Sequence, residues 1–290
     1  MSSAIPCTIE LAPKQAIELQ DLDRMIPAGT EVFVTDLGND DVEETVAAAK
    51  RLRDVGLVAV PHIAARRVTT MASLHERVRR LATDAGVDNV LVIGGGLDKP
   101  AGPFDSTMAL LETGILAEHG IGRVAVAGHP EGSPDFSNDE ATEALRQKQA
   151  FGERTGIEMR IVTQFGFDAK AIIAWLDRLA ADGIAMPVHV GVAGPATLKT
   201  LLRYAAFCGV GASMSFLKKN ALKVTALART QSPEEVVAPL EARWRSPERG
   251  PLTGLHVFPF GGTAKSSDWL RERGSWPPVG AASVASVAAE

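Results

Sequence analysis

Short apolar runs rich in valine and isoleucine recur along the whole chain, and they alternate with segments whose apolar residues are spaced three or four apart. Because the runs are apolar at consecutive positions, they are typical of parallel strands that are covered on both faces. The segments between them have the period of helices that cover a sheet. Eight runs are predicted to be strands: residues 7–11, 31–35, 57–62, 90–93, 124–127, 159–164, 187–191 and 254–258.

Several of the intervening segments also carry helix start and stop signals. Asp40 and Glu43 form a predicted capping box, and the helix that follows is expected to end at Gly56. Two further helices are expected to end at Gly86 and Gly183. The apolar stripes that these helices would bury are Val42, Val46, Ala49, Leu52 and Val55; Leu74, Val78 and Leu81; and Ile172, Ile173, Leu176 and Leu179.

Strands and helices that alternate at intervals of roughly 25 to 35 residues predict an α/β protein with the (β/α)8 TIM barrel fold in a single domain. An open doubly wound sheet is the main alternative, but the first strand leads into LAPKQ and lacks the glycine fingerprint of dinucleotide-binding folds. We expect the barrel to occupy residues 1–262 and a C-terminal extension with a mobile tail to occupy residues 263–290. Residues 211–250 are long enough for two helices, so the seventh unit is expected to be elaborated.

Composition narrows the function classes. The 290 residues are 46% hydrophobic and 22% charged, which excludes a disordered or fibrous chain. Thirty basic residues against thirty-five acidic ones give a net charge of -5, which argues against nucleic acid and anionic membranes as partners. Cys7 and Cys208 form no CxxC pair, and residues 1–6 do not resemble a signal peptide. No apolar run approaches the roughly 18 residues that span a bilayer, so we expect a cytoplasmic protein.

In a (β/α)8 barrel, the residues at the carboxyl ends of the strands surround the active site. Here these positions offer one carboxylate, neutral polar groups and glycines, without a strand lysine for a Schiff base or an HxH or HExxH metal motif. A bound organic cofactor would supply the chemistry that these side chains lack. The candidates are Glu10, Thr35, His62, Gly94, Gly95, Gly96, His129, Gln164, Gly191 and Phe260. His189 and His256 are interpreted as structural, and His75 and His119 as helix-surface residues.

At these strand ends the sequence resembles the methylenetetrahydrofolate reductase family, whose members are flavoproteins built on a (β/α)8 barrel. The most specific segment is TQFGFD at residues 163–168, which is similar to the family's T-Q-[FL]-F-F-D run. Five shorter motifs keep the family's order: IEL at 9–11 for F-E-F, PHI at 61–63 for P-H-L, HPE at 129–131 for Y-P-E, GVAGP at 191–195 for P-G-I-x-P, and GLH at 254–256 in the last strand.

The resemblance implies the interconversion of 5,10-methylenetetrahydrofolate and 5-methyltetrahydrofolate, with hydride transfer through N5 of FAD. Glu10 matches the family's general acid, which exchanges a proton near N10 of the folate as the one-carbon bridge opens or closes. Burial beside Ile9 and Leu11 would raise the pKa of this carboxyl toward neutrality. NAD(P)H, the family's other redox partner, stacks on the flavin without a fingerprint of its own, so the electron donor or acceptor stays open.

The resemblance also implies binding roles. Gln164 matches a residue that hydrogen-bonds the pterin ring, which suits an amide because it offers a donor and an acceptor together. Tyr204 matches a phenylalanine that packs on the folate, and Phe260 matches a leucine that does likewise. Thr35 and His62 match flavin-contacting positions. Family members are oligomers, so the resemblance implies a homo-oligomer.

Several positions depart from the family pattern. Its R-G-D after the fourth strand is replaced by Gly94, Gly95 and Gly96, with Asp98 two residues later as a possible substitute. Loss of a negative charge near the ring would raise the flavin potential and favour oxidation of methyltetrahydrofolate. Near the flavin tail, His129 replaces a tyrosine and Ser133 replaces a histidine. Lys148 is displaced by about half a turn from a family lysine.

Two functions therefore stay open. The first is a folate-dependent flavin oxidoreductase. The second is a barrel that keeps the folate site and acts as a transferase or a non-catalytic folate binder. Each candidate residue also has a plain structural interpretation: Glu10 as a paired carboxylate, the three glycines as a tight turn, and Tyr204 as an aromatic on the core face of a helix.

Overall fold

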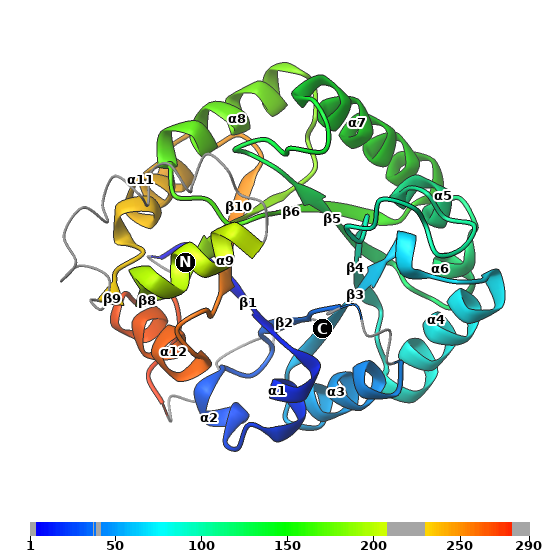
Figure 1. Cartoon of the computed structure of the whole chain (residues 1–290). Coiled ribbons are helices and arrows are strands. Elements are labelled where there is room, and N and C mark those ends of the chain that lie inside the picture. The colour runs from blue at the N-terminus through cyan, green and yellow to red at the C-terminus, as the bar shows by residue number, and fades with distance from the viewer. Residues whose placement is uncertain (1–3, 37, 39–41, 208–229, 280–290) are drawn as a thin grey trace, which may run out of the picture.

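Eight parallel strands close into a barrel in the computed structural model, which describes residues 4–36, 38, 42–207 and 230–279 (Figure 1). Neighbouring strands follow the order β1-β10-β7-β6-β5-β4-β3-β2 around the barrel. All eight predicted strands are confirmed, with ends that differ by at most two residues. The barrel strands are β1 (Cys7–Leu11), β2 (Glu31–Val34), β3 (Val58–Ala64), β4 (Asn89–Ile93), β5 (Arg123–Gly128), β6 (Glu158–Thr163), β7 (Val188–Ala193) and β10 (Leu252–Phe258).

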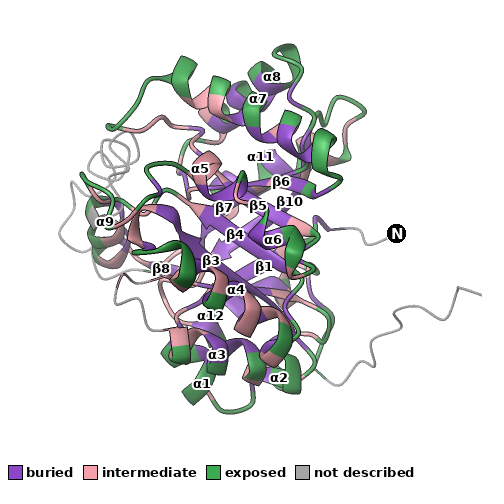
Figure 2. Ribbon diagram, turned by 90° about the vertical axis from the view of Figure 1, so that its right-hand side faces the viewer, coloured by how far each residue is buried: buried purple, intermediate pink, exposed green. Residues whose placement is uncertain are grey.

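Helices surround the barrel, and Figure 2 shows that their outer surfaces are exposed while the strands are buried. The predicted helices ending near Gly56, Gly86 and Gly183 are confirmed as α3, α4 and α8. The helices are α1 (Pro13–Glu18), α2 (Leu22–Met25), α3 (Val42–Asp54), η1 (Ala65–Arg67), α4 (Met71–Ala85), α5 (Thr107–Leu111), α6 (Ile115–Glu118), α7 (Asn138–Thr155), α8 (Ala169–Ala181), α9 (Leu198–Phe207), α11 (Glu234–Arg245) and α12 (Thr263–Glu272).

Helix α4 illustrates how the sequence sets an element. Thr70 caps its first turn by accepting a hydrogen bond from the backbone N–H of Ser73, and the Ser73 hydroxyl oxygen accepts from the Thr70 N–H in return. Gly86 ends the helix in the left-handed conformation, with a φ of 66° that favours glycine. Its stripe of Leu74, Val78 and Leu81 is buried as predicted. The capping residue Asp40 proposed for α3 lies outside the described residues.

The inside of the barrel is filled by one residue from each of several strands. This inner cluster consists of Phe33, Val60, Leu91, Ala125 and Val162. Because residues two apart on a strand face the same side, the inward series of β2 runs from Glu31 through Phe33 to Thr35. On every strand, alternate residues therefore face the barrel interior from its amino end to its carboxyl end. The candidate residues lie at the carboxyl end.

A network of charges closes the amino end of the barrel. The Glu31 carboxylate forms an ion pair with Arg160 from β6, lies 3.5 Å from Nη1 of Arg123 and accepts a 2.8 Å hydrogen bond from the Asn89 amide. The Arg160 guanidinium also lies 5.3 Å from the centre of the Phe33 ring. Because buried charges are tolerated only when they are paired, this network ties four strands together at one end.

The seventh unit holds more than a single helix. Between β7 and β10 the chain forms β8 (Ala196–Thr197), which pairs antiparallel with β9 (Thr230–Gln231), and the helices α9 and α11. Residues 208–229, including Cys208, lie outside the described residues. Figure 1 looks along the barrel axis and shows α9 across part of the barrel opening, and Figure 2 shows α9 at the left-hand side of the molecule.

Helix α12 follows the last barrel strand and buries Trp269 and Leu270. The division of the chain into residues 1–262 and a C-terminal extension stays a prediction, and residues 280–290 lie outside the described part. In that part, no helix combines the length and the apolar character needed to cross a bilayer.

Candidate active site

The carboxyl ends of the barrel strands bring the predicted site residues to one end of the molecule. All eight strands are parallel in one closed sheet, so residues at their carboxyl ends share one rim. Glu10 on β1, His62 on β3 and Gln164 after β6 therefore lie at the same end of the barrel. The loop of Gly94, Gly95 and Gly96 follows β4 at that rim as well.

Glu10 lies between two histidines inside the barrel. Its Oε2 is 3.6 Å from Nε2 of His62 and 3.5 Å from Nε2 of His256, and its side chain is only 15% exposed. Burial raises the pKa of Glu10, while the neighbouring His62 works against that rise. Burial lowers the pKa of His62 to about 4 and that of His256 to about 3. Near neutral pH both rings are therefore uncharged, and the carboxyl retains a proton more readily than it would in water.

The tautomer of His256 depends on which acceptor the Thr8 hydroxyl donates to. The Thr8 hydroxyl donates to the Leu255 carbonyl at 3.3 Å, and its oxygen lies 2.9 Å from Nδ1 of His256. A hydroxyl has a single hydrogen, so its oxygen accepts the hydrogen of Nδ1 in this arrangement. Nε2 then presents a lone pair toward Glu10, which suits a protonated carboxyl.

At this rim Oγ1 of Thr35 is buried without a hydrogen-bond partner among the described residues, and the buried Nε2 atoms of His62 and His256 face the Glu10 carboxyl at 3.6 and 3.5 Å without a closer partner there. Buried polar groups are costly unless they are paired. Their convergence at the carboxyl end of the strands is therefore typical of a site that completes its hydrogen bonds with a bound molecule.

Gln164 presents hydrogen-bond donors at the same rim. Its Oε1 accepts a 3.0 Å bond from the Phe165 backbone N–H, and its amide nitrogen has no acceptor in the described part of the chain. The loop that carries it is anchored by Glu131, whose carboxylate accepts bonds from the Phe167 and Asp168 backbone N–H groups at 2.8 and 3.1 Å. A side chain at Gly166 would approach that carboxylate to 2.6 Å, which explains the glycine.

Aromatic side chains form a wall beside Gln164. The rings of Tyr204 from α9 and Phe260 after β10 stack with centroids 4.1 Å apart and planes at 13°. Phe165 meets Phe260 edge-on at 4.8 Å, and Phe258 extends the group toward His256. The two predicted substrate-binding aromatics are thus brought together, at a position that a flat ring system can share.

The glycine loop leaves room at the rim. Gly95 and Gly96 have φ angles of +102° and +61°, and a Cβ atom at Gly94 or Gly96 would meet nothing within 4 Å. Arg67 holds the loop by donating from Nε to the Gly95 carbonyl at 3.0 Å. Asp98 is exposed and makes no hydrogen bond or ion pair with the described residues. The backbone of this loop can therefore be approached closely by a planar molecule.

His129 and Lys148 form a second polar group near the end of β5. Burial lowers the pKa of Lys148 to about 8, and burial together with the charge of Lys148 lowers the pKa of His129 to about 4. The ring of Phe136 packs edge-on against His129 at 5.0 Å. A partly buried ammonium beside a neutral imidazole offers hydrogen-bond donors to an anionic group such as a phosphate.

Some site residues were not identified from the sequence. His256 was interpreted as structural, although the inward series of β10 places it between Gly254 and Phe258 and beside Thr8 of β1. That register was the signal that could have identified it. Arg66 and Arg67, which donate to the carbonyls of Leu97 and Gly95, lie in a short helix after β3 that carries no motif.

The buried histidines predict a pH dependence of stability. The pKa values of His62, His129 and His189 are lowered from 6.5 to about 4, and that of His256 to about 3. The unfolded chain therefore binds more protons than the folded chain below pH 6.5, so we expect the free energy of unfolding to decrease as the pH falls from 6.5 toward 4. Urea unfolding at several pH values measures this trend.

Glu10 acts in the opposite sense on stability. Because its folded pKa is raised above 4.5, it stabilises the folded chain below that pH and loses this contribution as the pH rises through its folded pKa. Four histidines outweigh one carboxyl, and a Glu10→Gln variant should show a steeper loss of stability on acidification. An unfolding free energy that stays level between pH 6.5 and 4.5 would contradict the assignment of neutral buried histidines.

Comparisons with known proteins agree with this geometry. The sequence model of one family, Methylenetetrahydrofolate reductase, matches residues 12–226. The 5,10-methylenetetrahydrofolate reductase of Pectobacterium carotovorum subsp. carotovorum is 27% identical over 173 residues, which cover 58% of this chain and 54% of that protein. Methylenetetrahydrofolate reductase 1 of Schizosaccharomyces pombe is 35% identical over 95 residues, or 32% of this chain and 15% of that protein. The match to the bacterial relative thus spans about half of its length.

A solved structure supports the fold alone. A putative lyase/mutase from Burkholderia cenocepacia J2315 superimposes with a TM-score of 0.50 and covers 93% of this chain and 81% of its own, at 13% sequence identity. At that identity the likeness concerns the barrel and its order of elements, and it carries no information on chemistry.

Proposed function

The chain belongs to the methylenetetrahydrofolate reductase family, and we propose that it is a flavin-dependent oxidoreductase that interconverts 5,10-methylenetetrahydrofolate and 5-methyltetrahydrofolate. The observation that carries this proposal is Glu10, a carboxyl with a raised pKa held between His62 and His256 at the carboxyl end of the barrel. A carboxyl whose pKa is raised holds its proton to a higher pH than one in water, so it can serve as a general acid in one direction and as a general base in the other.

In the reductive direction, protonated Glu10 delivers its proton to N10 of the folate, which opens the one-carbon bridge to an iminium that can accept a hydride. In the oxidative direction, the ionised carboxylate receives that proton as the ring closes. Burial raises the pKa of the carboxyl, and neutral forms of His62 and His256 would oppose that rise less than charged rings would. A lone pair on Nε2 of His256 can accept a hydrogen bond from the protonated carboxyl and hold it in place. His256 is thereby assigned a positioning role.

The residues at the rim fit a flavin. Bound FAD would supply the hydride donor and acceptor of the reaction. Thr35 offers a buried hydroxyl without a partner among the described residues, His62 matches a flavin-contacting position of the family, and the loop of Gly94, Gly95 and Gly96 leaves open space for a planar ring. His129 and Lys148 would hold the phosphate groups of the cofactor.

The folate would lie between Gln164 and the aromatic wall. The amide nitrogen of Gln164 can donate to the pterin ring, since only its oxygen is engaged by the backbone. Tyr204 and Phe260 provide the flat apolar surface against which the substrate packs. In this proposal the aromatic wall and the amide face one bound molecule together.

We expect oxidation of methyltetrahydrofolate to be the favoured direction. The glycine loop brings no charge to the rim, and Asp98 is exposed without a partner among the described residues that would fix it there. A flavin without a nearby negative charge is more easily reduced to its anionic form. Measuring the rates of flavin reduction by methyltetrahydrofolate and by NADH identifies the preferred electron donor.

An absorption spectrum of the protein reconstituted with FAD tests the proposed function directly. We expect a bound-flavin spectrum that bleaches on anaerobic addition of methyltetrahydrofolate, faster than it bleaches with NADH. A protein that binds no flavin after reconstitution would contradict the proposed oxidoreductase. Faster bleaching by NADH than by methyltetrahydrofolate would contradict only the proposed direction.

The second candidate function is a folate-binding barrel that acts as a transferase or without catalysis. It is favoured by one observation, the replacement of a charged loop by three glycines with Asp98 exposed beside it. Tight tetrahydrofolate binding without flavin binding or redox turnover would select this alternative.

Replacing Gln164 with leucine tests the folate site. We expect affinity for tetrahydrofolate to fall by about tenfold or more, because the pterin loses a hydrogen bond and its own polar groups lose a partner. The flavin spectrum should be unchanged, and tetrahydrofolate titration followed by fluorescence measures the affinity. Gln147→Leu, an exposed position on α7, is the matched control. Equal affinity in the two variants would remove Gln164 from the folate site.

A cytoplasmic location and a homo-oligomeric state remain predictions. Gel filtration with light scattering measures the oligomeric state of the purified chain. The proposed chemistry itself draws its residues from a single barrel, since Glu10, His62, His256 and Gln164 all belong to one closed sheet and its loops.

A further inference from the structure

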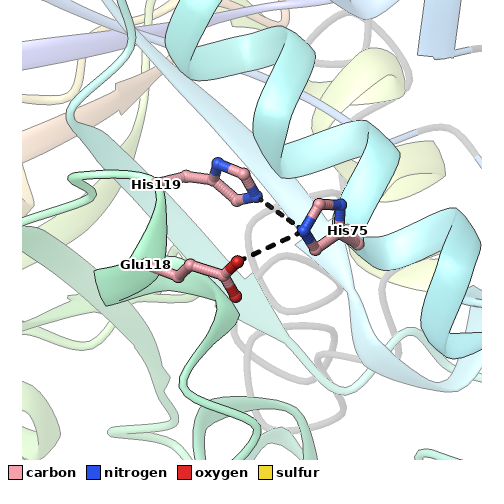
Figure 3. Close-up of side chains that lie close together, drawn as sticks. All are labelled: His75, Glu118 and His119. Carbon is pink, nitrogen blue, oxygen red and sulfur yellow. Dashed lines mark hydrogen bonds and ion pairs between the residues drawn. The ribbon is translucent and has the colours of Figure 1, made fainter.

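Three metal-ligating side chains converge on the outside of the barrel, away from the Glu10 site. His75 lies in α4, Glu118 is the last residue of α6, and His119 follows it as the C-cap. Figure 3 shows the three side chains pointing toward one another across these two helices. Residues more than forty positions apart in sequence thus present two imidazoles and a carboxylate to one point.

Two of the three ligand-atom separations fit a tetrahedral metal ion. Nε2 of His75 is 3.2 Å from Nε2 of His119 and 3.4 Å from Oε1 of Glu118, and the three ligand atoms all lie within 4.8 Å of one another. Zinc bonds to nitrogen and oxygen are about 2.0 to 2.1 Å long, so neighbouring ligand atoms on a tetrahedron are separated by roughly 3.3 to 3.4 Å. The His75–His119 and His75–Glu118 contacts match that separation, and the Glu118 and His119 ligand atoms lie within 4.8 Å of each other, a gap that rotation of the partly exposed Glu118 side chain can adjust.

Hydrogen bonds cannot fully satisfy Nε2 of His75, Nε2 of His119 and Oε1 of Glu118 at the same time. Nε2 of a neutral histidine carries either one hydrogen or one lone pair. If His75 donates its hydrogen to the Glu118 carboxylate, the same hydrogen must also be shared with the lone pair of His119. If His75 instead accepts from His119, its lone pair faces a carboxylate oxygen at 3.4 Å. A divalent cation satisfies all three atoms at once, because each would then direct a lone pair at the ion.

The backbone already holds the ligands in place. The His119 N–H donates to the Ile115 carbonyl and the Glu118 N–H to the Gly114 carbonyl, while His75 lies within the second turn of α4. The two imidazole rings meet at 77° with centroids 4.5 Å apart, so they converge edge to face and do not stack. Metal binding would have to order only side chains that are partly exposed, at 44% for His75 and 60% for Glu118.

We infer that His75, Glu118 and His119 form a surface binding site for a divalent transition-metal ion, with zinc as the best match, that clamps α4 to α6. Two imidazoles and one carboxylate are a ligand set that zinc accepts with a water in the fourth position, which the exposure of His75 and Glu118 allows. The site is separate from the proposed flavin and folate sites, so its role is to stabilise the helical layer.

Calorimetric titration of the untagged full-length chain with zinc chloride tests this site. We expect one equivalent of zinc to bind and to raise the thermal midpoint, since an ion that binds only the folded chain stabilises it. His75→Gln and His119→Gln should each weaken zinc binding by about tenfold or more. Glu76→Gln is the matched control, because Glu76 lies beside His75 on α4 but pairs with Arg79.

Cobalt gives a second readout that does not depend on stability. The unaltered chain should develop the visible absorption of tetrahedral Co²⁺, and both histidine variants should lack it while retaining the circular dichroism of the folded barrel. Zinc binding of equal strength in the unaltered chain and both histidine variants would overturn the inference. So would the absence of binding at millimolar zinc, which would leave His75, Glu118 and His119 as a hydrogen-bonded surface cluster.

Discussion

Replacing Glu10 with glutamine should slow the folate half-reaction by about 10²- to 10⁴-fold, the usual loss when a positioned general acid or base is removed. Glutamine keeps the shape of the side chain and can still contact His62 and His256, but it cannot transfer the proton that opens or closes the one-carbon bridge. Flavin occupancy should therefore be unchanged. Stopped-flow bleaching of bound FAD by methyltetrahydrofolate measures the rate.

The pH profile separates loss of an acid from loss of structure. Because the pKa of Glu10 is raised, the reductive rate of the unaltered chain should fall as the pH rises through that pKa, and the oxidative rate should rise over the same interval. The glutamine variant should show neither change. Glu43→Gln, on the outer surface, is the matched control. A rate for Glu10→Gln within about threefold of this control would show that another group moves the proton.

The geometry predicts that loss of His256 has a different effect from loss of Glu10. His256 touches the carboxyl and the Thr8 hydroxyl from within the barrel, so its loss would change the pKa of Glu10 more than it would remove a proton carrier. Burial keeps the two histidines neutral, and this neutrality matters for Glu10, because a charged ring beside it would favour the ionised carboxylate and weaken it as an acid.

The barrel could be predicted from the sequence because its strands are apolar on both faces and its helices carry glycine stops. Thr35, Gln164 and Phe260 could be placed at one rim for the same reason, since each follows a strand whose end the pattern marked. The helix capped by Thr70 was predicted from its apolar stripe. These features required only the local sequence patterns and the rule that the carboxyl ends of parallel barrel strands lie at one rim.

Contacts between elements distant in sequence were harder to predict. The predicted (β/α)8 fold makes the first and last barrel strands neighbours, but the register that sets His256 of β10 beside Thr8 of β1 is not determined by any local pattern. His75 and His119 each looked like an ordinary surface residue of its own helix. Their convergence depends on how α4 and α6 pack, which the spacing within either helix does not determine.

The opposite end of the barrel carries the largest expected effect on stability. Replacing Glu31 with alanine should reduce the free energy of unfolding by about 3 to 5 kcal/mol, because it leaves the Arg160 guanidinium inside the barrel without its carboxylate. The Arg160 side chain is only 16% exposed, and its Nε and Nη2 already lack hydrogen-bond partners among the described residues. Arg123 keeps Asp88 as a partner at 2.7 Å, so Arg160 is the residue that loses its carboxylate partner in this variant. Urea unfolding at pH 7 measures the change.

An exposed ion pair serves as the control that tests whether burial causes the loss of stability in Glu31→Ala. Glu43 forms an ion pair with Arg80 but is 76% exposed, so Glu43→Ala should lower the free energy of unfolding far less than Glu31→Ala does. Arg160→Met should cost less than Glu31→Ala, because Glu31 would keep Arg123 and the Asn89 amide as partners and the methionine would still pack on Phe33. Equal losses for Glu31→Ala and Glu43→Ala would mean that the ion pair inside the barrel is solvated like one on the surface, and the amino end would then not be held by buried charge.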